Sequence, residues 1–274
     1  MYKIVACDLD ETLLRTDRTI SKKDKEAILK ARELGVKFVP ATGRGFHTVQ
    51  VTLKDLGLYN QDDEYVISFN GGAISENKDN KLLSLRGISF EVAEFLFKKG
   101  LTYDVCIHLY TIDTVYAYNY TQQEKEYLNG RMEVIEIFDR NIDFLRDQQI
   151  VKVLYMNTDY DYLTTIEKDI DKELKGIAIS YSSNRYIEFN HLGVSKGEGL
   201  LSLAKLLGVK QEETIAIGDN FNDLSMIKMA GLGVGVQNVA KGVMPYCDYI
   251  CDATHNESAV AEVINQFILK AREQ

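Results

Sequence analysis

Two aspartates, Asp8 and Asp10, follow a short apolar run near the start of the chain. The run, residues 4–7, predicts a buried strand. Residues two apart in an extended chain point the same way, so the two carboxylates are expected side by side at the strand's end. Adjacent carboxylates repel each other unless a cation or a shared proton compensates them. The pair therefore indicates either a metal or catalytic site or an ordinary polar loop that caps a strand.

Three further polar clusters follow a predicted strand or open a predicted helix: Thr42-Gly43, Lys196, and Asp219 with Asn222 and Asp223. Taken singly, each has an ordinary explanation as a helix start, a solvated lysine or a capped turn. Ligands of open α/β sheets bind outside the carboxyl ends of the strands, so all four clusters are expected to converge. Such a set of carboxylates, lysine, hydroxyl and backbone N–H groups suits Mg²⁺ together with a phosphate.

The residue types allow a division of roles around that phosphate. A carboxylate can attack phosphorus and form an aspartyl-phosphate, and Asp8 at the strand end is the candidate. Asp10 could protonate the leaving oxygen and later activate a water molecule. Lys196 would offset the negative charge of the nucleophile and the phosphate.

The remaining candidates would hold the phosphate and the cation. Thr42 and the Gly43 N–H, at a predicted helix N-terminus, can bind phosphoryl oxygens, and Asn222 can donate to the phosphate. Asp219 is placed to hold the cation. Asp223, one helical turn further on, would either bind the metal or orient the lysine.

The elements that must position these residues alternate between strands and helices. Strands are predicted at residues 4–7, 36–40 and 65–69, with a helix capped by Ser21 and another beginning near Phe46. A hairpin is expected over residues 73–84. After residue 191 a helix from Lys196, strands near 214–217, 233–236 and 248–251, and a final helix over 258–272 follow. This order predicts an α/β fold with a parallel, doubly wound (Rossmann-like) sheet.

The middle of the chain has a different pattern. Alternating apolar residues predict antiparallel strands at 103–110, 114–120, 151–156, 177–181 and 186–189, with helices at 89–99, 122–128 and 160–174. We interpret residues 85–189 as a separate α+β domain, inserted into a discontinuous core formed by residues 1–84 and 190–274.

Composition excludes some classes of protein. The 274 residues carry a net charge of −9, which argues against binding nucleic acid through its phosphates. Neither a signal peptide nor an apolar run long enough to span a membrane is evident. The four cysteines show no disulfide framework. We therefore expect a cytoplasmic protein that acts on a small molecule; the sequence does not indicate an oligomeric state.

The polar clusters, taken together, resemble the four motifs of the haloacid dehalogenase superfamily. The matching segments are Asp-Leu-Asp-Glu-Thr-Leu (8–13), Ala-Thr-Gly-Arg (41–44), Lys-Gly (196–197) and Gly-Asp-Asn-Phe-Asn-Asp (218–223). Asn-Gly-Gly-Ala (70–73) and Gly-Val-Ser-Lys-Gly (193–197) are similar to segments of its Cof-type phosphatases. An insert between the second and third motifs matches a C2-type cap.

The resemblance implies a Mg²⁺-dependent phosphatase with Asp8 as nucleophile and Asp10 as acid and base. It also implies a metal site formed by Asp8, the backbone carbonyl of Asp10, and Asp219, with Asp223 supporting. The implied phosphate contacts are Leu9 N–H, Thr42, Gly43, Lys196 and Asn222. The expected substrate is a small phosphorylated metabolite, a sugar phosphate above all.

Two alternatives use the same motifs. A sugar phosphomutase would employ the same aspartyl-phosphate, and a non-catalytic module would bind a phosphorylated ligand without turnover. Release of inorganic phosphate distinguishes the phosphatase from both.

Overall fold

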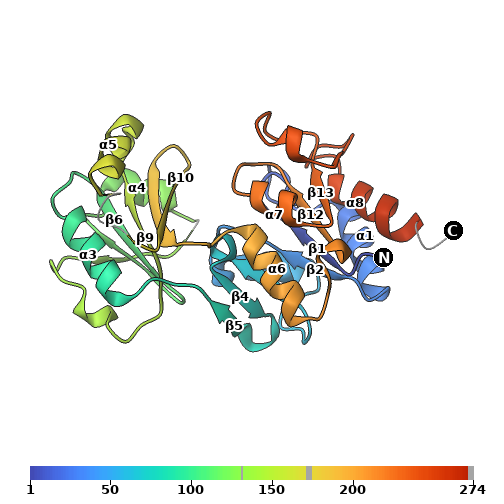
Figure 1. The fold of residues 1–274 in the computed structure, drawn as a ribbon, viewed down its shortest axis with the longest axis horizontal. Coiled ribbons are helices and arrows are strands. Elements are labelled where there is room, and N and C mark those ends of the chain that lie inside the picture. Colours follow the sequence, from blue (N-terminus) through green and yellow to red (C-terminus); the bar gives the residue numbers. More distant parts are fainter. Residues whose placement is uncertain (131, 171–174, 271–274) are drawn as a thin grey trace. The chain divides into compact units, whose positions relative to one another are not determined.

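The computed structural model describes residues 1–130, 132–170 and 175–270. The chain forms two units, Met1–Ser84 with Ser195–Gln274, and Leu85–Val194 (Figure 1). The chain returns to the first unit at Ser195, whereas the sequence pattern placed that boundary at residue 190, near the end of the last strand of the second unit.

A five-stranded sheet forms the centre of the first unit. All of its strand pairs are parallel, in the order β14-β13-β12-β1-β2, which confirms the predicted doubly wound α/β core. Its strands are β1 (Ile4–Cys7), β2 (Lys37–Pro40), β12 (Thr214–Gly218), β13 (Leu232–Gly235) and β14 (Tyr249–Ile250). In register, Cys7 lies opposite both Pro40 and Ile217. The residues that follow these strands therefore leave the sheet at the same edge.

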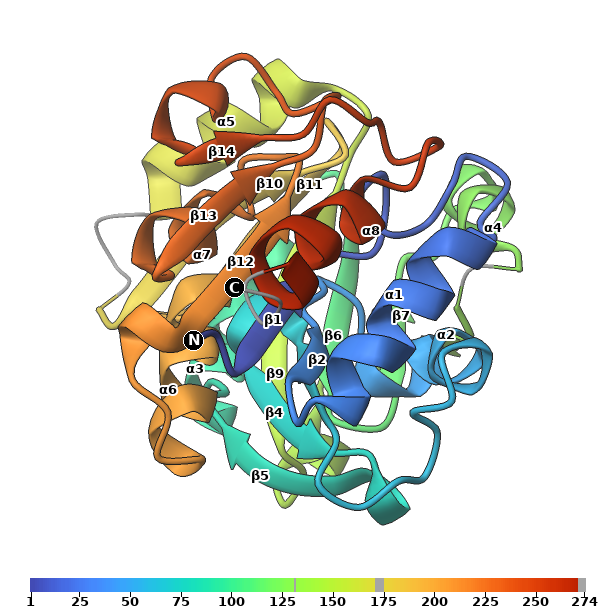
Figure 2. The same ribbon diagram turned by 90° about the vertical axis from the view of Figure 1, so that its right-hand side faces the viewer.

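Helices cover both faces of this sheet because side chains of a strand alternate between faces. Val5 and Cys7 belong to the same apolar cluster as residues of α1 and α8, which lie side by side (Figure 2). Ile4 and Ala6 belong to a second cluster with residues of α6 and α7. The helices of this unit are α1 (Lys22–Glu33), α2 (Gln50–Asp55), α6 (Lys196–Leu206), α7 (Leu224–Met229) and α8 (Ala259–Ile264).

Two predicted helices of the first unit can be compared with the structure in detail. Ser21 caps α1 as expected, because its Oγ accepts the Asp24 N–H at 2.9 Å. The final helix, predicted over 258–272, consists of α8 and a wider π-helical turn, Asn265–Leu269. Residues 271 and 272 of that prediction lie outside the described part of the chain.

The strand expected third in the parallel sheet pairs differently. β3 (Tyr65–Ser68) forms one parallel bridge, between its Ile67 and Ala41, the residue after β2. Its regular partner is the antiparallel strand β4 (Ala73–Glu76), and β5 (Lys81–Leu85) completes a three-stranded sheet. The tight turn after Ser68 reverses the chain and so offers β3 a neighbour that is close in sequence. The predicted hairpin over residues 73–84 is confirmed.

The second unit contains a six-stranded sheet in the order β10-β11-β9-β6-β7-β8. Its pairs are antiparallel except for β7 with β8. Its strands are β6 (Cys106–Thr111), β7 (Val115–Tyr118), β8 (Ile135–Ile137), β9 (Ile150–Met156), β10 (Ile177–Ser182) and β11 (Tyr186–His191). β8 was not predicted, because three residues are too few for a recognisable alternation.

The described part of this unit also contains the helices α3 (Phe90–Gly100), α4 (Gln122–Leu128) and α5 (Tyr160–Ile170). Residues 171–174, the end of the helix predicted over 160–174, lie outside the described residues. One sheet face packs in a large apolar cluster with α3 and α5. The other face buries polar residues, among them His108 and an ion pair between Lys152 and Glu188 at 2.5 Å. No helix in the described part of the chain is long and apolar enough to cross a membrane.

Candidate active site

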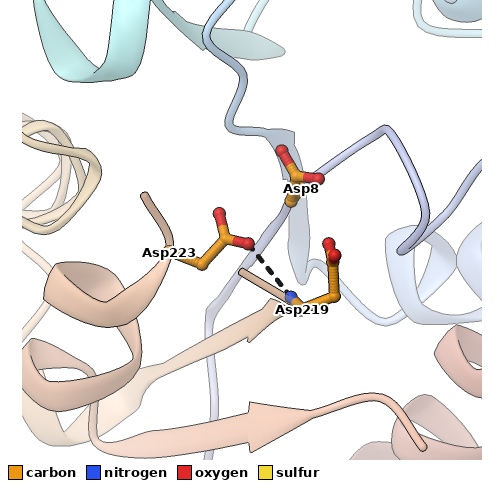
Figure 3. A group of neighbouring side chains, drawn as sticks. All are labelled: Asp8, Asp219 and Asp223. Atoms are coloured by element: carbon orange, nitrogen blue, oxygen red, sulfur yellow. Dashed lines mark hydrogen bonds between the residues drawn. The ribbon is translucent and has the colours of Figure 1, made fainter. Parts of the chain in front are cut away.

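Three aspartates, Asp8, Asp219 and Asp223, lie together where β1 and β12 end (Figure 3). Each offers a carboxylate oxygen within 4.8 Å of the others, and all three residues are buried. The Asp8 N–H donates to the carbonyl of Ile217, so the pairing of the two strands continues to the first acid. The parallel register therefore brings residues more than 200 positions apart in the sequence to one place.

The turn between β12 and α7 is built around the carboxylate of Asp223. Its Oδ2 accepts the backbone N–H groups of Asp219 and Asn220, both at 3.0 Å. Gly218 makes this possible, because a Cβ there would lie 2.4 Å from the Cβ of Asp223. The carboxylate thus fixes the loop that carries Asp219.

Lys196, the first residue of α6, joins the acids from the other side. Its side chain is fully buried, and its Nζ lies 2.5 Å from Asp8 Oδ1 and 2.6 Å from Asp223 Oδ1. The helix is capped by Ser195, whose Oγ accepts the Glu198 N–H at 3.2 Å. The lysine therefore bridges two of the three carboxylates.

Burial disfavours the charged form of the carboxylates in this cluster. It raises the pKa of Asp8, an effect that Lys196 opposes and Asp223 reinforces. Burial also opposes the charge of Lys196, but the two adjacent carboxylates outweigh it and raise the pKa of the lysine. Desolvation raises the pKa of Asp219 to about 6. Three buried acids facing one lysine favour additional positive charge at this place.

Thr12 belongs to the site, although the sequence pattern does not predict a role for it. Its buried Oγ1 donates to Asp219 Oδ1 at 2.7 Å. The only signal in the sequence is a hydroxyl residue two positions after Asp10. A contact across 207 positions could not be inferred from that signal.

Asp10 stands apart from the three clustered acids. Its side chain is 54% exposed, and its carboxylate forms an ion pair with Arg44. Because its side chain is accessible and lies outside the buried cluster, Asp10 can contact a bound molecule.

The Thr42-Gly43 segment does not open a helix, which corrects the prediction. After β2 the chain is irregular, a 3₁₀ turn covers Phe46–Val49, and α2 begins only at Gln50. The buried Thr42 instead accepts the Arg44 N–H on its Oγ1 at 3.1 Å. The hydroxyl stabilises a tight turn, and the first helical residue, Phe46, comes three positions after Gly43.

Leu9 and Asn222, the other two expected phosphate contacts, differ in the exposure of their side chains. The side chain of Leu9 is fully buried in the apolar core, so only its backbone can face a ligand. Asn222 is exposed, and its Nδ2 donates to Asn70 Oδ1 at 3.4 Å. Asn70 and Arg44 thus join the neighbourhood of the candidate site.

Comparison with known proteins places the chain in a family. A family model described as haloacid dehalogenase-like hydrolase matches residues 5–264. The protein belongs to the haloacid dehalogenase-like hydrolases, which confirms the resemblance drawn from the four motifs.

Individual relatives agree in fold and in class. The protein named "Putative phosphatase YxeH" from Bacillus subtilis (strain 168) is 30% identical over 98% of this chain and 99% of its own length. The 5-amino-6-(5-phospho-D-ribitylamino)uracil phosphatase YcsE of the same organism is 27% identical over 97% and 96%. A solved haloacid dehalogenase-like hydrolase from Bacteroides thetaiotaomicron superposes with a TM-score of 0.85, at 30% identity, over 98% of this chain and all of that one. The protein is accordingly a hydrolase that acts on phosphate esters.

Proposed function

We propose that this protein is a Mg²⁺-dependent phosphatase that hydrolyses a small phosphorylated metabolite through an aspartyl-phosphate on Asp8. The observation that carries the proposal is the buried cluster of Asp8, Asp219 and Asp223 with Lys196 bridging two of them. Such a cluster has both a nucleophile and an excess of negative charge that a divalent cation would compensate.

The donor set fits Mg²⁺, which prefers oxygen ligands and carboxylates in particular. Asp8 and Asp219, with the backbone carbonyl of Asp10, would hold the ion, and Asp223 would support them. When bound, Mg²⁺ would polarise a phosphoryl oxygen and neutralise negative charge that develops during the transfer.

The chain's own residues account for the covalent steps. An Asp8 oxygen attacks phosphorus while the bond from phosphorus to the leaving oxygen breaks, and Asp10 gives its proton to that oxygen. Asp10 then takes a proton from water, whose oxygen attacks the same phosphorus and releases inorganic phosphate and the Asp8 carboxylate. Lys196 opposes the rise in the pKa of Asp8 and so favours the ionised nucleophile. It would contact the phosphate together with Leu9 N–H, Thr42, Gly43 and Asn222.

The second unit would act as the cap. We assign this unit, which the sequence pattern ends at residue 189 and the structure at Val194, to an inserted α+β cap domain. Met1–Ser84 and Ser195–Gln274 would form the catalytic core. A sugar phosphate is the substrate class we favour, because the relative YcsE is named for a substrate whose phosphate is carried by a ribityl chain.

Replacing the nucleophile tests the proposal. Asp8→Asn keeps the shape of the side chain but should lower Mg²⁺-dependent turnover of p-nitrophenyl phosphate by at least about 10³-fold. Circular dichroism would verify that the variant is folded, and Asp62→Asn, at an exposed loop position, serves as the matched control. Undiminished turnover in Asp8→Asn would refute the mechanism. With a sugar phosphate as substrate, release of an isomerised sugar phosphate in place of inorganic phosphate would identify a mutase.

A further inference from the structure

The turn that follows β3 holds an unusual backbone conformation. Phe69, Asn70 and Gly71 have φ angles of 51°, 54° and 94°. A left-handed backbone costs a residue with a side chain about 1–2 kcal/mol, and asparagine tolerates it better than phenylalanine does. Strain of this kind persists only where the surroundings hold it, and it concentrates at functional sites.

One side of this turn is tied to the segment that contains Thr42 and Gly43. The Phe69 N–H donates to the carbonyl of Arg44 at 3.0 Å, and the Asn70 N–H donates to the carbonyl of Thr42 at 2.9 Å. These two bonds fix the turn against one of the expected phosphate-binding segments.

The other side of the turn packs against the beginning of α6. A Cβ on Gly71 would lie 2.0 Å from the carbonyl oxygen of Ser195, the residue before Lys196. Only glycine permits this approach. The turn therefore lies between the segment of Thr42 and the start of α6, the helix that carries the buried Lys196.

The side chain of Asn70 reaches a third segment. Its Oδ1 accepts a hydrogen bond from Asn222 Nδ2 at 3.4 Å, and it would lie 3.1 Å from a Cβ on Gly43. The carboxamide of Asn70 thus lies between two residues that we assign to phosphate binding.

We propose that Asn70 is a positioning residue whose amide oxygen fixes the orientation of the Asn222 carboxamide. A carboxamide can present either its oxygen or its NH₂ group to a ligand, and the hydrogen bonds around it decide which. With one N–H of Asn222 held by Asn70, the second N–H is directed to a phosphate oxygen. The reversed carboxamide would place its oxygen against the phosphate and repel it.

This inference rests on the proposed function, in which Asn222 contacts the phosphate. It also gives a reason for asparagine at position 70. An aspartate could accept the same hydrogen bond, but it would bring negative charge next to a phosphate. An alanine would leave Asn222 without its acceptor and keep the strained backbone.

Glycine is the appropriate replacement, because it removes the amide and relieves the left-handed strain. We expect Asn70→Gly to fold normally and to bind inorganic phosphate about tenfold more weakly in the presence of Mg²⁺, as for the loss of a hydrogen bond to a charged group. Isothermal titration calorimetry measures this affinity without requiring turnover. The KM for p-nitrophenyl phosphate should rise by a similar factor, with a smaller change in kcat.

A double-mutant cycle shows whether Asn70 acts through Asn222. Asn222→Ala should weaken phosphate binding at least as much, and Asn70→Gly should add little in that background. Asn80→Gly is the matched control, because Asn80 also has a left-handed φ of 49° and its Oδ1 accepts from the Gln50 carboxamide at 3.1 Å. This control should bind phosphate like the unaltered protein.

Additive losses in the double variant, or unchanged phosphate affinity in Asn70→Gly, would overturn the positioning role. Equal losses in Asn70→Gly and Asn80→Gly would also overturn it, because they would indicate a general structural effect. If the unaltered protein binds phosphate but never turns over p-nitrophenyl phosphate, the proposed phosphatase function fails. The coupling between Asn70 and Asn222 would still be measured by calorimetry.

Discussion

Replacing His108 with phenylalanine should change how the stability of the protein depends on pH. His108 lies on β6, on the polar face of the six-stranded sheet, and is 1% exposed. Neither ring nitrogen has a hydrogen-bond partner among the described residues. Burial, with a smaller effect of the charges on Lys152 and Arg185, lowers the pKa of His108 to about 3.

The size of the effect follows from proton linkage. In the unfolded chain a histidine takes up a proton near pH 6.5, whereas the folded protein keeps His108 neutral until about pH 3. Between these two values only the unfolded state gains the proton. Stability therefore falls by about 1.4 kcal/mol for each pH unit below 6.5, which amounts to about 2 kcal/mol at pH 5.

Urea unfolding at pH 7 and at pH 5, followed by circular dichroism, measures this difference. Phenylalanine at position 108 retains an aromatic ring beside Tyr120 and Tyr186 but cannot titrate. We expect the variant to lose about 2 kcal/mol less than the unaltered protein between the two pH values. His191→Gln, at an exposed position, should retain the full dependence.

An equal loss of stability in the unaltered protein and in His108→Phe would refute this reasoning. It would mean that His108 is charged in the folded state. The nearby acid that could stabilise that charge is Glu124, whose Oε1 lies 3.4 Å from His108 Nε2. The comparison thus decides whether burial or this carboxylate controls the protonation of the histidine.

Two further predictions concern the carboxylate cluster. Lys196→Met should abolish phosphatase activity. Without Mg²⁺ at pH 7, it should also lower the free energy of unfolding by about 3–5 kcal/mol, because Asp8 and Asp223 lose the buried cation between them. Urea unfolding measures this loss, and an unchanged midpoint would contradict the prediction. Thr12→Val should raise the Mg²⁺ concentration for half-maximal activity about tenfold, because Asp219 loses the hydroxyl that orients it. In that variant a normal Mg²⁺ requirement with lowered kcat would instead assign Thr12 to the chemical step.

The central sheet and the cluster of acids could be predicted because they depend on regular features. Residues 4–7 and 215–217 are continuous apolar runs, as expected for strands buried on both faces, and parallel strands bring their carboxyl ends together. Asp8 follows the first run directly, and Asp219 follows the second after Gly218. Their proximity therefore follows from the topology, without knowledge of any side-chain contact.

The features that could not be predicted depend on local geometry. Whether Thr42 begins a helix is decided by the hydrogen bond of its hydroxyl to the Arg44 N–H, which competes with helical pairing. The pairing of Asp10 with Arg44 depends on side-chain orientations in two loops. β8 is held by its neighbour β7, since a three-residue strand has little preference of its own.

The hydrogen bonds of the three acids also distinguish their roles toward a cation. Asp223 uses Oδ1 for Lys196 and Oδ2 for two backbone N–H groups, so both of its oxygens are already engaged. Asp8 and Asp219 each engage only Oδ1, with Lys196 and Thr12 respectively, among the described residues. A carboxylate oxygen without a partner is the better ligand for Mg²⁺. We therefore expect Asp8 and Asp219 to bind the ion directly and Asp223 to hold the lysine and the loop around it.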